Sequence, residues 1–79
     1  MIRLNDVFMQ FKKINSQSLA AIAYDSDAAL LEVKFKISGR IYAYLEVQKE
    51  LYLKFINSKS KGQFFNKFIK LKHKYFLVK

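Results

Sequence analysis

The chain of 79 residues has no cysteine, no proline and only two glycines. The absence of cysteine excludes disulfide scaffolds and metal sites built on thiolates. Without proline and with so little glycine, the sequence contains no linker, repeat or low-complexity tract, and we expect a single domain over residues 1–79. The hydrophobic content of 52% argues against a disordered chain.

Long apolar runs are also missing. The longest run, residues 19–24, is far too short to cross a bilayer. The start, MIRLND, lacks the apolar region of a signal peptide. We therefore expect an intracellular, cytoplasmic protein without a membrane partner.

Side chains for metal binding or catalysis are scarce. The six carboxylates are scattered without the spacing of metal ligands, so we expect no metal site. Nucleophilic catalysis needs an activated nucleophile beside an oriented base, and Ser58, Ser60 and the single histidine, His73, form no recognisable arrangement. His73 stands among lysines and is expected to be solvated. We expect no enzymatic activity, no catalytic residue and no cofactor.

Positive charge, in contrast, is abundant, with a formal net charge of +9. Thirteen of the fifteen basic residues are lysine, which codon bias in an AT-rich genome can partly explain. Residues 1–50 carry seven basic and six acidic side chains, whereas residues 51–79 carry eight lysines and no acidic residue. Nucleotide bias does not explain why one segment contains no acidic residue. The last third of the chain therefore predicts a surface for an anionic partner.

Three segments have the character of β-strands. Residues 19–24 (LAAIAY) are apolar, and residues 30–37 (LLEVKFKI) alternate apolar and charged side chains. A Ser-Gly turn follows, and residues 40–47 (RIYAYLEV) return as a third strand. Residues 73–78 (HKYFLV) fit a closing extended segment. The pattern predicts a three-stranded antiparallel meander in an α+β fold.

Segments whose apolar residues have helical spacing precede and follow this meander. A short N-terminal helix is predicted over residues 5–14, and a second helix over residues 48–57. A third helix begins at Ser60, whose side chain can accept a hydrogen bond from the amide of Gln63. Its apolar stripe comprises Phe64, Phe65, Phe68 and Ile69. We expect the two C-terminal helices to cover the meander.

The start of the third helix also has lysines on both sides of its capping serine. A phosphate can approach amides at a helix start, where Lys59 and Lys61 would flank it. The segment is not a P-loop, because the required glycine spacing and the Lys-Ser/Thr pair are missing.

Tyr42 and Tyr44 alternate and therefore share one face of the third strand. A two-residue loop at Ser38 and Gly39 would pair Phe35 with Tyr42 and place both tyrosines in the core. A three-residue loop would turn both to the opposite, lysine-bearing face, as a platform on which bases can stack.

If the tyrosines lie in the core, the other face of the sheet mixes charged and apolar side chains: Glu32, Lys34, Lys36, Ile41, Ala43 and Leu45. Ile41 and Leu45 would need cover there. The N-terminal helix or a second copy of the chain would supply it, so a homodimer stays open as an alternative.

Two motifs resemble the KTSC domain family, named for its occurrence at the C-terminus of some lysyl-tRNA synthetases and also found as a stand-alone protein. They are the Tyr-x-Tyr centre and the Ser-x-Gly-x-Phe-Phe-Asn motif, here Tyr42, Tyr44, Ser60, Gly62, Phe64, Phe65 and Asn66. The resemblance covers residues 14–76 and leaves residues 1–13 as an extension. Gln48 stands where the family usually has a proline. The resemblance implies an α+β fold, and the synthetase context suggests RNA binding.

We therefore expect a small non-enzymatic domain that binds nucleic acid, RNA in preference to DNA. Its phosphate contacts are expected from Lys59, Lys61, Lys67, Lys70, Lys72 and Lys74. Such contacts supply affinity but little sequence specificity, and the near-absence of arginine argues against sequence-specific duplex recognition. Asn66 would either satisfy backbone groups or read a base.

The alternative is a protein-binding module. A small basic domain could be a phage or mobile-element product that docks on a host protein or nucleoprotein. The same lysines would then meet an acidic protein surface, and the apolar anchors would be Ile41, Leu45 or Phe8.

Overall fold

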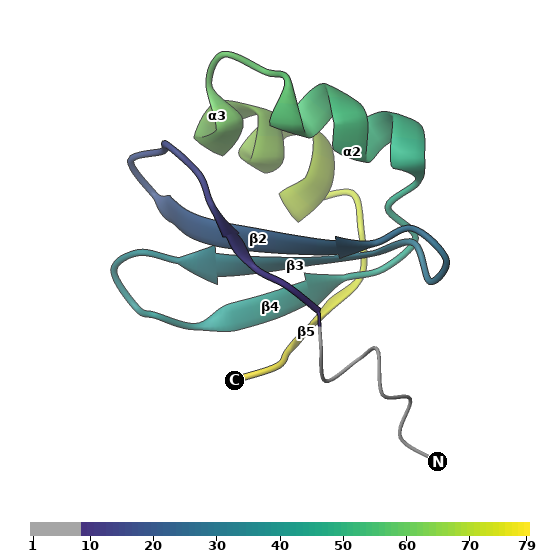
Figure 1. Cartoon of the computed structure of the whole chain (residues 1–79), viewed down its shortest axis with the longest axis horizontal. Coiled ribbons are helices and arrows are strands. Elements are labelled where there is room, and N and C mark those ends of the chain that lie inside the picture. Colours follow the sequence, from purple (N-terminus) through teal and green to yellow (C-terminus); the bar gives the residue numbers. More distant parts are fainter. Residues whose placement is uncertain (1–8) are drawn as a thin grey trace.

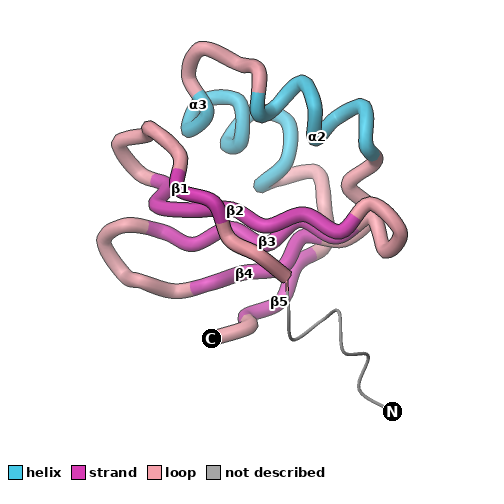
Figure 2. Tube along the Cα trace, viewed as in Figure 1, coloured by secondary structure: helices cyan, strands magenta, loops and turns pink. Residues whose placement is uncertain are grey.

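The computed structural model describes residues 9–79, which form an antiparallel five-stranded sheet with helices over one of its faces (Figure 1). The strands lie in sequence order: β1 (Lys12–Lys13), β2 (Leu19–Asp25), β3 (Leu30–Phe35), β4 (Ile41–Tyr44) and β5 (Tyr75–Leu77). The helical segment between β4 and β5 comprises α2 (Lys49–Ile56), α3 (Lys61–Phe65) and the π-helical turn η1 (Asn66–Lys70). Figure 2 shows this segment leaving the sheet after β4 and returning to it through β5.

The α+β class and the two C-terminal helices are confirmed, but the three-stranded meander is wrong. β5, within the segment expected to be extended, pairs with β4 through Tyr42 and Leu77. β1 pairs with β2 at the opposite edge. Both added strands are short and lie at the edges, where backbone pairing with a neighbour rather than side-chain periodicity defines the strand.

The N-terminal helix predicted over residues 5–14 is also wrong where the structure describes it. Residues 5–8 lie outside the described residues, and residues 9–11 are not helical. Lys12 and Lys13 pair with β2, and the amide of Ile14 donates to the carbonyl of Ala20. Hydrogen bonding to the edge of β2 therefore overrides the helical spacing of the apolar residues.

The β3–β4 hairpin adopts neither of the two registers considered from the sequence. Val33 pairs with Tyr42 and Leu31 pairs with Tyr44, which leaves a four-residue loop, 36–39. Gly39 supplies the positive φ of 72° that ends this loop. A four-residue loop has the same parity as a two-residue loop, so both tyrosines face the helices, as the core interpretation required.

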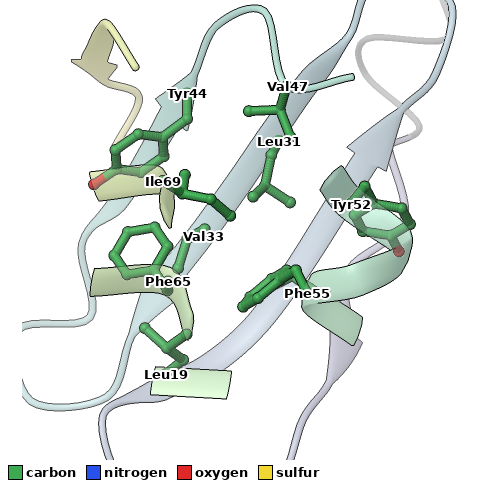
Figure 3. Packing of buried hydrophobic residues seen from close by; sticks show 10 residues of the cluster. Leu19, Leu31, Val33, Tyr44, Val47, Tyr52, Phe55, Phe65 and Ile69 are labelled. Carbon is green, nitrogen blue, oxygen red and sulfur yellow. The ribbon is translucent and has the colours of Figure 1, made fainter. Parts of the chain in front are cut away.

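The core lies between the sheet and the helices, and Figure 3 shows Leu31 and Val33 opposite Phe55, Phe65 and Ile69. All five of these side chains are fully buried. The predicted periodicity thus places Phe55 of α2, and Phe65 and Ile69 of the following helical segment, against the sheet. Phe68, which was assigned to the same apolar stripe, is instead exposed.

A register shift in β2 brings Leu19 into this core. Leu19 pairs with Phe35 but Ala21 pairs with Lys34, so Ala20 is an inserted residue. Such a bulge changes which face the following side chains take. Leu19 and Ile22, three residues apart, consequently both join the core cluster.

Of the residues assigned from the sequence to the other face of the sheet, Lys36 lies in the β3–β4 loop and Leu45 follows the end of β4. The others lie on the strands, and this face is less open than expected. Ala43 is fully buried there, and Ile41 and Leu45 are half-buried. Of the apolar anchors suggested for a protein partner, Ile41 and Leu45 are thus partly covered, and Phe8 lies outside the described residues.

Candidate nucleic-acid interface

The Tyr-x-Tyr pair divides between core and surface. Tyr44 is only 3% exposed and packs edge-to-face on Phe65, with ring centroids 5.1 Å apart. Burial, with Tyr75 and Tyr42 nearby, raises the pKa of Tyr44 to about 12. Tyr42 is half-buried, and its ring meets those of Phe35 and Tyr75. Tyr44 is therefore a packing residue, whereas Tyr42 keeps an accessible side.

Tyr42 lines a cavity of about 540 Å³ between the β3–β4 loop, β4, β5 and the end of η1, which we call the Tyr42 cavity. Its aromatic walls are Phe35, Tyr42, Tyr44 and Tyr75. Arg40 and Lys70 are its cations, and no lining residue is acidic in this described part of the chain. Aromatic walls combined with positive charges suit a ligand that is both planar and anionic.

Two further apolar residues line this cavity and are highly exposed. Ile37 in the β3–β4 loop is 99% exposed, and Leu71 after η1 is 85% exposed. Side chains so exposed lie at the rim of the cavity and contribute little to the core. Exposed apolar side chains of this kind often mark a contact surface.

The Ser-x-Gly motif lines a second depression of about 510 Å³, which we call the Ser60 hollow. Its lining is mainly polar and includes Ser16, Ser18, Lys59, Lys61 and Asn66. The hollow joins the loop before β2 to the start of α3, which are about forty residues apart in the chain. The tertiary structure therefore brings together two polar segments that the sequence keeps apart.

Helix capping and close packing explain the spacing of this motif without a ligand. The Gln63 amide donates to Ser60 Oγ at 3.4 Å, which confirms the predicted helix cap. A Cβ atom at Gly62 would lie 3.0 Å from Ser18 Oγ. Glycine at position 62 thus lets α3 approach the loop before β2 closely.

The two motif phenylalanines pack in different environments. Phe65 is fully buried and contacts the rings of Phe35, Tyr44 and Phe55. Phe64 is half-buried, with the ring of Phe55 at 6.0 Å. Both act in packing, whereas the adjacent Asn66 is exposed and lines the Ser60 hollow.

The six lysines expected to bind phosphate do not gather at one point. Lys59 and Lys61 line the Ser60 hollow, and Lys61 Nζ donates to the carbonyl of Ser58. Lys70 lines the Tyr42 cavity. The remaining three are Lys67, which lies over the ring of Phe68, and Lys72 and Lys74 in the segment before β5. All except the half-buried Lys61 are exposed, so their ammonium groups are available to a solvated anion.

The expectation of a solvated His73 is wrong. Its side chain is half-buried, and Nδ1 lies 2.9 Å from the carbonyl oxygen of Leu45. A carbonyl can only accept, so Nδ1 carries the proton and donates. This bond ties the segment before β5 to the end of β4, next to the backbone bond from the Leu45 amide to the carbonyl of Lys74.

Sequence reasoning missed most of the Tyr42 cavity. It named Tyr42 as a motif residue and Lys70 as a phosphate contact without joining them, and it gave Arg40, Phe35 and Tyr75 no role in a site. The available signal was Ile37, an apolar residue in a turn with no core to enter. Tyr75 joins the cavity only because β5 pairs with β4, which is a long-range contact.

Over residues 9–79, no group of three or more His, Cys, Asp or Glu side chains is placed to hold a metal ion. Within the same residues, no helix has the length and apolar character needed to cross a membrane.

Comparison with known proteins agrees with these motifs. The family model of the KTSC domain matches residues 15–75. A protein of Stutzerimonas stutzeri (strain A1501), described as uncharacterized, is 35% identical over 60 residues, which cover 76% of this chain and 83% of that protein. The crystal structure of a KTSC domain protein from Yersinia pestis is similar with a TM-score of 0.85 and 34% identity, covering 90% of this chain and 99% of the other. The chain belongs to the KTSC domain family.

Proposed function

We propose that this domain binds single-stranded nucleic acid, RNA in preference to DNA, through phosphate contacts from its lysine-rich last third. The observation that carries the proposal is the charge of residues 51–79, with eight lysines and no acidic residue. The phosphate contacts come from the six lysines named above, five of which are exposed. Such a segment attracts a polyanion and releases its counterions on binding.

A single strand fits this chain better than a duplex read in its grooves. Only two of the fifteen basic residues are arginine, the residue best suited to read guanine with two hydrogen bonds. Lysines contact phosphates as point charges, and exposed aromatic rings such as that of Tyr75 can stack on unpaired bases.

The test is fluorescence anisotropy with labelled single-stranded RNA, single-stranded DNA and duplex RNA across a series of salt concentrations. About four phosphate contacts give a log–log slope near −3 on a single strand. Binding that disappears above low salt would show that the charge is generic, and would contradict the proposal.

A pair of matched variants locates the contacts. The triple substitution of Lys70, Lys72 and Lys74 by glutamine should reduce the slope by about 2, since each phosphate contact on a single strand contributes about 0.7. The control replaces Lys12, Lys13 and Lys34, which are also exposed, and removes the same charge. Equal effects of the two triples would show that net charge, rather than this segment, controls binding.

A protein partner is the second candidate, and the exposure of Ile37 and Leu71 favours it. In that case Ile37→Ser and Leu71→Ser would abolish binding to the partner, whereas lysine substitutions would mainly slow association. For nucleic acid the order of effects is reversed, so the two sets of variants distinguish the candidates.

A further inference from the structure

The Tyr42 cavity has features that phosphate binding alone does not use. Four aromatic side chains form its walls, yet Tyr75 keeps 58% of its surface exposed. The ring of Tyr75 meets Tyr42 at 5.7 Å and Tyr44 at 5.5 Å, which holds it in place. A ring that is both fixed and exposed is suited to stack against a planar ligand.

Two cations reach this aromatic site from different elements. Arg40 follows the β3–β4 loop, and Lys70 ends η1. The Arg40 backbone is held at both its polar groups: its amide donates to Ser38 Oγ at 3.1 Å, and its carbonyl accepts from the Phe35 amide at 2.9 Å. An anionic group at the edge of a stacked ring therefore has two positively charged partners.

We infer that the Tyr42 cavity is a subsite for one unpaired base of a single-stranded nucleic acid. The base stacks on the exposed ring of Tyr75, and the adjoining phosphate lies against Arg40 and Lys70. The volume of about 540 Å³ is within the range of roughly 300–1,000 Å³ typical of sites for small ligands, and a nucleotide is of that size. This inference rests on the proposed function and adds the stacking of one base, which does not depend on the identity of the base, to its phosphate contacts.

The charge of the lining residues favours a nucleotide base, with its phosphate, over an apolar side chain of a protein as the occupant of the cavity. The lining holds two positive residues and no negative one in the described part of the chain. An apolar side chain would leave both cations without a role, whereas a nucleotide uses the aromatic walls and the cations together.

The experiment compares two probes with the same number of phosphates. One is a single-stranded RNA of eight nucleotides, and the other is an abasic ribose-phosphate strand of the same length. Affinities are measured by competition anisotropy at one fixed salt concentration. The base-bearing strand should bind at least about fivefold tighter, the lower end of the effect of one stacked base.

Substitutions at Tyr75 then place the base. Tyr75→Leu should reduce the affinity for the base-bearing strand to that of the abasic strand, and Tyr75→Phe, which keeps the ring, should preserve the preference. The matched control is Phe76→Leu on the same strand. Phe76 is 49% exposed and pairs with Ala43, so its side chain takes the opposite face of the sheet, and the preference should persist. Far-UV circular dichroism confirms that each variant is folded.

Each outcome decides the matter. If both probes bind equally to the unaltered protein, the base subsite is wrong but the proposed function stands. If Tyr75→Leu keeps the preference, or Phe76→Leu removes it, the base lies elsewhere and the inference is overturned. If neither probe binds, the proposed function and the subsite fail together, and the exposed Ile37 and Leu71 point to a protein ligand instead.

Discussion

Phe65 is expected to be among the most destabilising positions for substitution in the chain, although it lies within a family motif that also includes surface residues. We consider Phe65→Leu, which keeps an apolar side chain and removes the ring. Phe65 is fully buried and lines neither the Tyr42 cavity nor the Ser60 hollow. The substitution therefore tests packing separately from binding.

The magnitude follows from three ring contacts. Phe65 meets the ring centroids of Tyr44 at 5.1 Å, Phe35 at 5.7 Å and Phe55 at 6.4 Å. Aromatic pairs contribute about 0.5–1.5 kcal/mol each beyond burial, and complete truncation of a buried phenylalanine costs about 3–5 kcal/mol. Leucine retains most of the apolar volume, so we expect a loss of about 2–3 kcal/mol. This is a large part of the roughly 4–12 kcal/mol typical of a domain of this size.

Urea denaturation followed by circular dichroism measures this loss, and Phe68→Leu is the control. Phe68 is three residues further along the same helical segment, is 38% exposed and has the ring of Phe64 at 4.7 Å. Its replacement should cost less than about 1 kcal/mol. RNA affinity of the folded Phe65→Leu protein should be unchanged.

Two results would refute this reasoning. Equal costs at Phe65 and Phe68 would show that burial against the sheet does not govern the stability of this segment. A loss of RNA affinity in a Phe65→Leu protein that is still folded would show that Phe65 has a role at the binding surface.

Three further predictions concern stability. Tyr44 contributes stability that is fully present below pH 10, its pKa in the unfolded chain, and is lost as the pH rises to about 12, its raised pKa in the fold. The free energy of unfolding from urea denaturation should therefore fall by about 1–2 kcal/mol in alkali, and Tyr44→Phe should abolish this fall. Gly39→Ala should cost about 1 kcal/mol, because alanine disfavours a φ of 72° although no atom lies within 4 Å of the added Cβ; no change in the midpoint would contradict this. Gln48→Pro should stabilise by about 0.5 kcal/mol, since Gln48 already has a φ of −68°, and a lower thermal midpoint would show that its amide is needed.

The spacing of apolar residues in the sequence was sufficient to predict the helices and strands that bury one whole face. The alternation of Leu31 and Val33 with charged residues predicted β3, and i, i+4 spacing predicted α2 almost to its ends. Ser60 was identified as a helix cap because this interaction is local, between residues three positions apart. These features depend on near neighbours in the chain, so a single sequence contains the information needed to predict them.

Long-range contacts decided the features of the fold and of the candidate site that the sequence did not predict. β1 and β5 are strands because β2 and β4 offer unpaired backbone groups at the two edges of the sheet, and side-chain patterns of two or three residues do not reveal such pairing. The hairpin register depended on a loop of four residues, 36–39, whereas the sequence suggested a loop of two or three residues. The Tyr42 cavity needs three separate segments to meet, those carrying Arg40, Lys70 and Tyr75. The sequence by itself determined the family, the class of fold and the charge of the last third, whereas the tertiary structure decided where that charge meets exposed aromatic rings.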